Sequence, residues 1–550
     1  MRFRRFTWAA ASACLVVAVA CSPADEAGDD DNGASDDPAA EDETADPDTE
    51  ADGATLRLAV PEQENPDLSA DWAYDNQRAL QLGNVFERLL TRDPESNELV
   101  GMLAHSWEQI DDLTYRFELV EGAQFHDGSE FNAEAAAISL EHLWRPDGRM
   151  AEVAAVADQE FFSFEAVDEF TLEVTTASPF PLTFERLSQS QIPSAQQVQE
   201  SPDTLGSDPI GTGPFVLAEH DRGAQWILER NEDWWGLDNP DQAYADFGDW
   251  ETVIFDVRPE RSTRVAALEA GEVDFAFDIG TEGCETVGED VCQTWSGNEV
   301  MDIRYEPPSA IMGDARVRRA LDLAFDREQI AAEIYGPDVE PTGQVVGPGS
   351  TGYNEDISPW PYDPDQAREL LEEAEADGVV FDQPMNIVTQ EGRFERNREV
   401  VEAIQFFWQD NLGIEVNIDV LEPSQYDELY RRQNGPLHDA VADDRNVIIV
   451  TTGSDVGTFD LEGYGNQRYT CGGNLSTYCD EEWTADWDAA GELLGDERDA
   501  AFAELNMSQY ERNVWSTILR FPTYHAAADT VQYSIRPDSW VSVSDFQPAG

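Results

Sequence analysis

The sequence contains no lysine. All 33 basic residues are arginines, against 114 acidic residues, so the formal net charge is −81. Without lysine the chain cannot supply a Walker A lysine, a Schiff-base lysine or the lysine of a Ser-x-x-Lys pair. A surface this negative repels phosphate backbones, so we expect no nucleic-acid partner. Such acidity is typical of proteins that stay hydrated where salt screens their self-repulsion, and we hypothesise a saline habitat.

Histidine is also scarce, with six residues scattered along the chain. The sequence has neither a His-Glu-x-x-His motif nor a Gly-x-Ser-x-Gly elbow. We therefore expect no catalytic residue, no metal site and no cofactor. A secreted hydrolase and a purely structural acidic envelope protein stay as remote alternatives.

The six cysteines fall into three sets of two. Cys14 and Cys21 belong to the leader, and two further sets, Cys284 with Cys292 and Cys471 with Cys479, are each separated by seven residues. Neither later set has the two-residue spacing of a zinc knuckle. In an exported chain we expect two local disulfides, with free buried thiols as the alternative.

The N-terminal region divides into a leader and a tether. Residues 1–20 begin with arginines and continue into an apolar run too short to span a membrane, which is the plan of an export signal. The run ends in Ala-Cys and resembles a bacterial lipobox, so Cys21 is expected to be lipidated; secretion without an anchor is the alternative. Residues 21–53 hold no large apolar side chain and predict a disordered acidic tether. The export route, general or twin-arginine, stays open.

The stretch Leu99–Leu143 contains three expected elements in a row. Ser106–Ile110 predicts a short strand, and Leu113–Leu119 alternates apolar and polar residues as a half-buried strand does. The two aspartates between them favour a turn. Asn132 is an N-cap residue type, and the apolar residues after it recur at helical spacing, which predicts a helix.

As one string, this stretch resembles the N-terminal signature of the extracellular solute-binding proteins of the dipeptide/oligopeptide-binding class, the receptors of ATP-driven importers. Four further segments match that family in the family's order. They are Pro209–Phe215 running into Leu228–Gly236, Ser262–Asp274, Val317–Arg327 and Tyr362–Leu371. Together the five strings are spread across the whole mature chain.

Strands alternate with helices along the rest of the chain, which indicates an α/β sheet. The expected elements include helices within Trp72–Leu90 and over Arg316–Ile334, Pro364–Ala376 and Arg498–Val514, a strand–helix–strand unit over Met385–Leu421, and strands over Val447–Val450 and Phe521–Tyr524. The Gly347–Gly352 segment fits the dinucleotide-binding glycine pattern by letter, but no helix opens on it, so it predicts a turn.

The resemblance implies a bilobed type-II periplasmic-binding-protein-like fold with an extra inserted subdomain. Lobe I would comprise residues 54–91, 209–302 and 521–550, the inserted subdomain residues 92–208, and lobe II residues 303–520. The ligand would sit in the cleft between the lobes, which would close about a hinge in the crossing strands.

Asp455 is the strongest candidate for ligand binding. It follows a predicted strand, and the carboxyl ends of strands in open α/β sheets bind ligands. By resemblance to the peptide-binding members, Asp455 would hold the α-ammonium group of a peptide, and Arg393 would meet its carboxylate. An Asx-turn role is the alternative for Asp455, and Arg396 and Arg398 compete for the role of Arg393.

Trp72 and Tyr74 complete the candidate ligand-binding residues. The resemblance implies a small-molecule or peptide ligand, with an oligopeptide or dipeptide as the leading candidate and a sugar or metal chelate as the alternative. It implies the permease and ATPase subunits of an ABC importer as partners. The protein is expected to be a monomer outside the cytoplasmic membrane or in the periplasm, with the lipid anchor as its only membrane contact.

Overall fold

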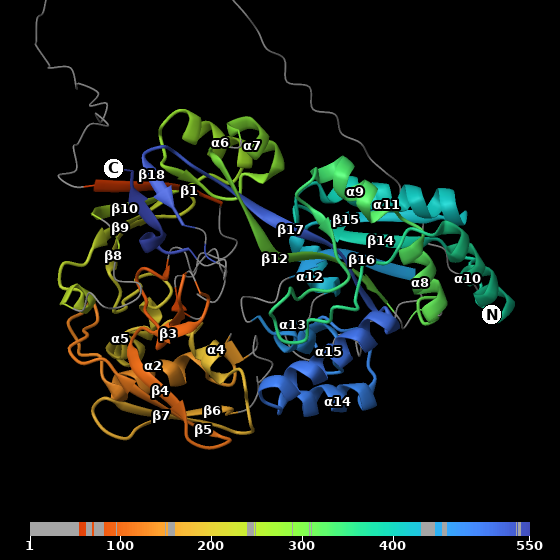
Figure 1. Cartoon of the computed structure of the whole chain (residues 1–550). Helices are drawn as coiled ribbons and strands as arrows, with labels where there is room; N and C mark the ends of the chain where they lie inside the picture. The colour runs from red at the N-terminus through yellow and green to blue at the C-terminus, as the bar shows by residue number, and fades with distance from the viewer. Residues whose placement is uncertain are drawn as a thin grey trace, which may run out of the picture. The chain divides into compact units, whose positions relative to one another are not determined.

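Figure 1 shows the computed structural model of the chain. The residues that it describes are 54–61, 69–70, 82–94, 96–148, 150–151, 160–238, 247, 249–288, 290–306, 309, 311–430, 446–453, 459–534, 536 and 541–549. Among them, none of the helices is both long and apolar enough to cross a lipid bilayer.

An 11-stranded sheet runs through the fold, in the order β15-β14-β16-β12-β17-β11-β1-β10-β9-β8 with β13 beside β17 (Figure 1). Its strands are β1 (Ala54–Val60), β8 (Phe215–Asp221), β9 (Gln225–Arg230), β10 (Trp250–Val257), β11 (Phe275–Ala276), β12 (Cys292–Tyr305), β13 (Glu340–Pro341), β14 (Met385–Gln390), β15 (Val416–Leu421), β16 (Asn446–Gly453) and β17 (Trp515–Ala527). Strand β1 pairs in parallel with β10 and β11, and β14 pairs in parallel with β15 and β16. The sheet therefore holds two parallel groups, as expected for an α/β protein.

Strands β12 and β17 run through both groups. Cys292–Trp295 pairs with the end of β17 near β11, and Glu299–Arg304 pairs with the start of β17 beside β16. The register of this antiparallel pair shifts between Trp295 and Glu299. The two parallel groups thus meet at an irregular point in the crossing strands.

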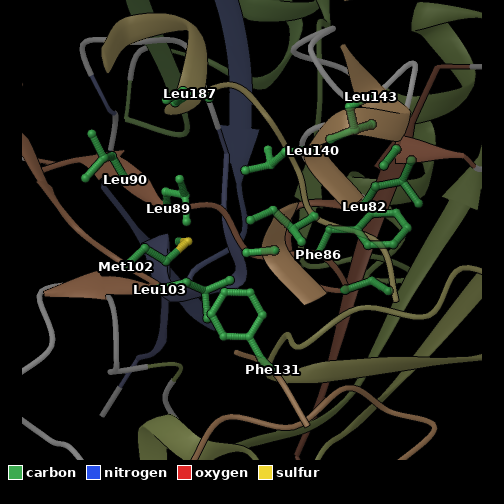
Figure 2. Close-up of a cluster of buried hydrophobic side chains, with 14 of the residues drawn as sticks. Leu82, Phe86, Leu89, Leu90, Met102, Leu103, Phe131, Leu140, Leu143 and Leu187 are labelled. Atoms are coloured by element: carbon green, nitrogen blue, oxygen red, sulfur yellow. The ribbon is translucent and has the colours of Figure 1, made fainter. Parts of the chain in front are cut away.

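Two large hydrophobic cores lie on either side of this point. The first draws its buried side chains from residues 56–277 and 531–546, and the second from residues 301–519. Figure 2 shows part of the first core, with Leu82, Phe86, Leu89, Leu90, Met102, Leu103, Phe131, Leu140, Leu143 and Leu187 labelled. We call the parts built around these cores the first and second lobes. The lobe boundaries given above stay a prediction.

The helices divide between the two lobes. Those of the first lobe are α2 (Ala133–Leu143), α4 (Thr183–Leu187), α5 (Ala195–Glu200), α6 (Arg261–Glu269) and α7 (Gly280–Val287). Those of the second lobe are α8 (Ala315–Leu323), α9 (Arg327–Ile330), α10 (Pro364–Ala376), α11 (Asn397–Leu412), α12 (Pro423–Tyr430), α13 (Leu461–Arg468), α14 (Glu481–Gly491) and α15 (Gly495–Arg512). Helix α10 has the predicted bounds, with the Asp363 side chain accepting from the amide of Gln366 at its start.

The predicted hairpin, turn and helix within Leu99–Leu143 are confirmed. A four-stranded antiparallel sheet of order β4-β5-β7-β6 carries them, with β4 (Ala104–Gln109), β5 (Thr114–Leu119), β6 (Phe162–Ala166) and β7 (Thr171–Thr176). Asn132 caps α2 by accepting a 3.0 Å hydrogen bond from the amide of Ala135. The Nε2 atom of His126, in the turn before α2, lies 2.9 Å from the carbonyl oxygen of Gly213.

The helix predicted within Trp72–Leu90 is wrong over its last part. Residues 71–81 lie outside the described residues, and after Leu82 the chain turns and enters the short strand β2 (Leu90–Arg92). The carbonyl oxygen of Val85 accepts a 2.9 Å hydrogen bond from the amide of Gly213. Pairing with a distant segment therefore replaces the local helical hydrogen bonds, although the apolar spacing is helical.

The single helix predicted over Arg316–Ile334 is also wrong. It is broken into α8 and α9, which a π-helical turn follows. The side chain of Asp326 accepts a 3.0 Å hydrogen bond from the amide of Gln329 and so caps a new helix. The Asp326 cap favours the start of a second helix at this position, whereas the apolar periodicity alone favours one continuous helix.

The strand predicted over Phe521–Tyr524 is part of the longer β17, which begins at Trp515. Helix α15 ends at Arg512 because Asn513, with φ 51°, takes up the left-handed conformation typical of a residue that follows a helix. The Gly347–Gly352 segment forms turns, as predicted.

Both later cysteine sets are joined. The sulfur atoms of Cys284 and Cys292 lie 1.99 Å apart, and those of Cys471 and Cys479 lie 2.08 Å apart. The first bridge ties α7 to the start of β12 in the first lobe, and the second closes a loop before α14 in the second lobe.

Candidate functional site

The carboxyl ends of parallel strands in both lobes carry charged residues. In the first lobe Asp278 follows β11, and in the second Arg393 follows β14. In open α/β sheets ligands bind at such strand ends. The residues around Asp278 form the first-lobe wall of the candidate site, and those around Arg393 form its second-lobe wall.

The first-lobe wall is held rigidly. The guanidinium of Arg264, 1% exposed, donates to the carbonyl oxygens of Phe277 (2.7 Å) and Asp278 (2.6 Å). Arg261 donates two hydrogen bonds of 3.1 and 3.0 Å to the Asp278 carboxylate. The amide of Asp278 donates to Nδ1 of His525 (3.3 Å), and burial lowers the pKa of His525 to about 4, which keeps the ring neutral and able to accept.

The second-lobe wall contains a polar atom without a partner among the described residues. Arg393 donates a 3.2 Å hydrogen bond to the carbonyl oxygen of Thr452 in β16. The Nε atom of Arg393 is buried and has no hydrogen-bond partner within the described part of the chain. Because buried polar groups are normally paired, this nitrogen can still donate to a ligand.

Glu299 lies beside this wall on the crossing strand β12. Its side chain still reaches solvent, yet loss of surrounding water raises the pKa of its carboxyl group, and the charge of Arg393 opposes that rise. The charge contact with Arg393 and a hydrogen bond with the Thr452 side chain place the Glu299 carboxylate beside the second-lobe wall.

The two walls touch at one side. The hydroxyl of Thr281, in α7 of the first lobe, donates a 3.2 Å hydrogen bond to the carboxylate of Glu395 in the second lobe. Gly280 has φ +68°, and a Cβ atom there would lie 2.8 Å from Oε2 of Glu395. Tyr335 fixes the other side of Glu395 by donating a 2.7 Å hydrogen bond to its carbonyl oxygen.

A second contact between the lobes lies at the α4 and α13 side. The guanidinium of Arg92 stacks 5.0 Å from the ring centroid of Phe459. Arg186 in α4 is 2% exposed, and burial lowers its pKa while the carboxylates of Glu462 and Asp460 oppose that change. The site is therefore bounded by interlobe contacts on two sides.

An open hollow of about 840 Å³ lies elsewhere, over β14, β15 and α11. Its lining includes Asn386, Arg398, Glu402 and Asn417. All of these belong to the second lobe, so the hollow does not join the two walls. The residues around Asp278 and Arg393, which belong to two lobes in contact through Thr281 and Glu395, are the better candidate site.

Of the residues predicted to bind ligand, Arg393 lies beside β16 through its bond to the Thr452 carbonyl oxygen, and its role in binding stays a prediction. Its competitors point elsewhere: Arg396 pairs with Glu399, and Arg398 lies 3.9 Å from Glu391 on the exposed surface. Asp455, Trp72, Tyr74 and Cys21 lie outside the described residues.

Sequence reasoning missed Glu299, Asp278 and Glu395. Asp278 follows β11 and Glu395 follows β14, and a position after the carboxyl end of a strand is a signal that could have identified them. Glu299 lies within a long crossing strand, and its position in the sequence carries no comparable signal.

The sequence matches the family described as "Bacterial extracellular solute-binding proteins, family 5 Middle" over residues 98–474, more than half of the chain. The chain belongs to this family. Its match is consistent with the two-lobed α/β fold and with a recess between the lobes.

Named relatives are binding proteins. The chain is 26% identical over 341 residues to the glutathione-binding protein GsiB of Pectobacterium atrosepticum, which covers 60% of this chain and 62% of that protein. It is 25% identical over 433 residues to di/tripeptide-binding protein 1 of Pseudomonas aeruginosa, covering 72% and 75% of the two chains. The chain thus spans less than two thirds of the glutathione-binding relative.

Solved structures share the fold. The ABC transporter substrate-binding protein CtaP of Listeria monocytogenes superposes with a TM-score of 0.77 at 18% identity, covering 90% of this chain and 100% of that one. This likeness establishes the type-II periplasmic-binding-protein fold for the present family 5 member.

Proposed function

We propose that this family 5 protein is a receptor that captures a small solute between its lobes and delivers it to the permease and ATPase subunits of an ABC importer. The observation that carries the proposal is the unpaired Nε of Arg393 beside a contact between the lobes. Two lobes with separate cores meet at Thr281 and Glu395, and the buried Nε of Arg393 has no hydrogen-bond partner within the described residues. Such a site binds a ligand by closing on it.

We propose a di- or oligopeptide as the solute. The names of the relatives support this choice, since one is a di/tripeptide-binding and another a glutathione-binding protein. A peptide enclosed between lobes needs opposite charges for its two ends. Arg393, with its unpaired Nε, would hold the carboxylate, and Asp455, which follows β16 in the sequence, would hold the α-ammonium group.

The remaining parts of the proposal concern aromatic ligand contacts, membrane attachment and oligomeric state. Trp72 and Tyr74 would contribute aromatic contacts to the ligand, and lipidation of Cys21 would anchor the chain through the tether of residues 21–53. The protein would act as a monomer on the outer face of the cytoplasmic membrane or in the periplasm, and it would not transform its ligand.

The test is a thermal-shift titration of the purified protein with a mixed di- to pentapeptide pool, followed by mass spectrometry of the pool. A receptor is stabilised by RT ln(1 + [L]/Kd), about 2.7 kcal/mol at a hundredfold excess over Kd. A rise in melting temperature with every peptide intact supports the proposal. Cleaved peptides would indicate an enzyme, and an unchanged melting temperature would reject the peptide ligand.

A further inference from the structure

Arg468 is a buried cation without a hydrogen-bond partner among the described residues. It is the last residue of α13 and is 8% exposed. Its guanidinium carbon lies 3.9 Å from the ring centroid of Tyr464 and 5.5 Å from that of Trp515. Its buried Nε has no hydrogen-bond partner, and the guanidinium forms no hydrogen bond or ion pair with any residue that the structure describes.

Other buried arginines of the second lobe are paired. Arg304, on the same Trp515 ring at 5.6 Å, donates 2.7 Å to Glu306 and 2.9 Å to the carbonyl oxygen of Leu475. Arg498 donates to both Asp460 and Glu462. Burying guanidinium donors without acceptors is unfavourable, so Arg468 differs from these arginines in having donors left for an acceptor that is not among the described residues.

The nearby carboxyl group of Asp302 does not serve as that acceptor. Its oxygens accept hydrogen bonds from the hydroxyls of Tyr464 and Thr517. Burial raises the pKa of Asp302 to about 6, although the charge of Arg468 opposes the rise. Both oxygens of Asp302 thus accept from hydroxyl groups, and Asp302 attracts Arg468 without accepting a hydrogen bond from it.

Arg468 lies at the same strand end as the proposed ligand site. Gly453 is the last residue of β16, and a Cβ atom there would lie 2.7 Å from Nη2 of Arg468. Successive residues of a strand point to opposite faces, so Arg468 faces Gly453 on the side of β16 opposite to the side chain of Thr452. Arg393 approaches the same strand end through the Thr452 carbonyl oxygen.

We infer that Arg468 receives a second anionic group of the ligand, so that the preferred solute carries two carboxylates, as an acidic peptide does. This inference rests on the proposed function. Arg393 would hold the terminal carboxylate and Arg468 an acidic side chain. The rings of Tyr464 and Trp515 restrict the guanidinium plane, which prepares it for two parallel hydrogen bonds to a carboxylate.

The test compares two peptide pools that differ only in whether their side chains carry a carboxylate or a neutral amide. The first is a di- to pentapeptide pool containing Glu, and in the second Gln replaces Glu. Affinities are measured by calorimetry for the wild-type protein, R468Q, R468K and the control R319Q. Arg319 also stacks on a ring, that of Trp360 at 4.4 Å, but it bonds the carbonyl oxygen of Glu511 at the surface.

We expect the wild-type protein and R319Q to bind the Glu pool about 10- to 100-fold more tightly than the Gln pool. R468Q should bind both pools equally, and R468K should keep part of the preference because it keeps the charge. If R468Q does not show a cooperative melting transition, R468K supplies the comparison. A wild-type protein without preference, or an R468Q or R468K variant with the full preference, would overturn the inference and leave the peptide proposal standing.

A wild-type protein that binds neither pool would overturn the peptide proposal separately. The dicarboxylate glutarate then tests Arg468 alone, through the melting temperature. Stabilisation by glutarate that is lost in R468Q would support the inference, and a wild-type protein that glutarate does not stabilise would overturn it.

Discussion

The hydroxyl of Thr281 donates a 3.2 Å hydrogen bond across the lobes to the carboxylate of Glu395. The two residues come from different cores, Thr281 from α7 and Glu395 from the loop before α11. This contact forms only when the lobes approach, so its loss reports opening of the recess.

Gly280→Ala should open the recess. The new Cβ atom would lie 2.8 Å from Oε2 of Glu395, and φ at this position is +68°. We expect a larger radius of gyration by small-angle X-ray scattering. Gly271→Ala is the matched control, because Gly271 has φ +71° with nothing within 4 Å of the added atom. Both variants carry the backbone strain of about 1–2 kcal/mol, so equal radii of gyration in the two would argue against the interlobe contact.

Asp302 should make folding stability fall as the pH rises. Burial raises the pKa of Asp302 from 3.8 to about 6, so the folded state holds this proton more tightly than the unfolded state. The contribution of Asp302 to the free energy of unfolding is fully present below about pH 4. It is lost as the pH rises through about 6, a change of about 3 kcal/mol.

Asp302→Asn should remove that part of the pH dependence. The hydroxyls of Tyr464 and Thr517, which donate to Asp302, can also accept from an amide. Urea unfolding of both proteins at several pH values between 4 and 7 measures the difference. Parallel stability curves for the wild type and the variant would show that Asp302 does not titrate in this range.

Reduction of the Cys471–Cys479 bridge should destabilise the second lobe. The bridge has a sequence separation of 8, and closing such a loop stabilises by roughly 2–3 kcal/mol in the entropic account. We expect a Cys471→Ser/Cys479→Ser variant to melt at a lower temperature than the oxidised protein. Free thiols at both positions in a non-reducing peptide map of the native protein would be inconsistent with the bridge.

Lipidation of Cys21 should bring the native protein into the detergent phase of a phase-partition experiment. Cys21→Ser cannot accept the lipid, so that variant should remain in the aqueous phase. Aqueous behaviour of both forms would show that the chain is exported without an anchor.

Local sequence signals predicted several helices correctly. They failed where a distant segment competes for the backbone hydrogen bonds of a helix. Helix α10 could be predicted because Asp363 caps it and Pro364 begins it. The turn after Leu82 could not be predicted, because the amide of Gly213 donates to the carbonyl oxygen of Val85, which a continuing helix would use. Periodicity describes one segment and carries no information on such pairing.

The candidate site was also predictable only in part, where a residue follows a strand that the sequence shows. Arg393 follows a recognisable strand and could be proposed from the sequence, whereas the place of Glu299 beside Arg393 depends on the pairing of β12 with β16. Arg468 was not singled out, because its missing partner is visible only once Tyr464, Trp515 and Gly453 are placed around it.

The central claim is that the interlobe recess binds a peptide through charged anchors at the ends of β14 and β16. Calorimetric titration of the purified protein with a mixed di- to pentapeptide pool tests it most directly, with Arg393→Gln and Asp455→Ala alongside. We predict saturable binding by the wild type and affinities about 10- to 100-fold weaker in each variant, since each removes a hydrogen-bonded charge partner. Absence of binding by the wild type would contradict the peptide ligand, and binding that both variants retain unchanged would contradict the anchors.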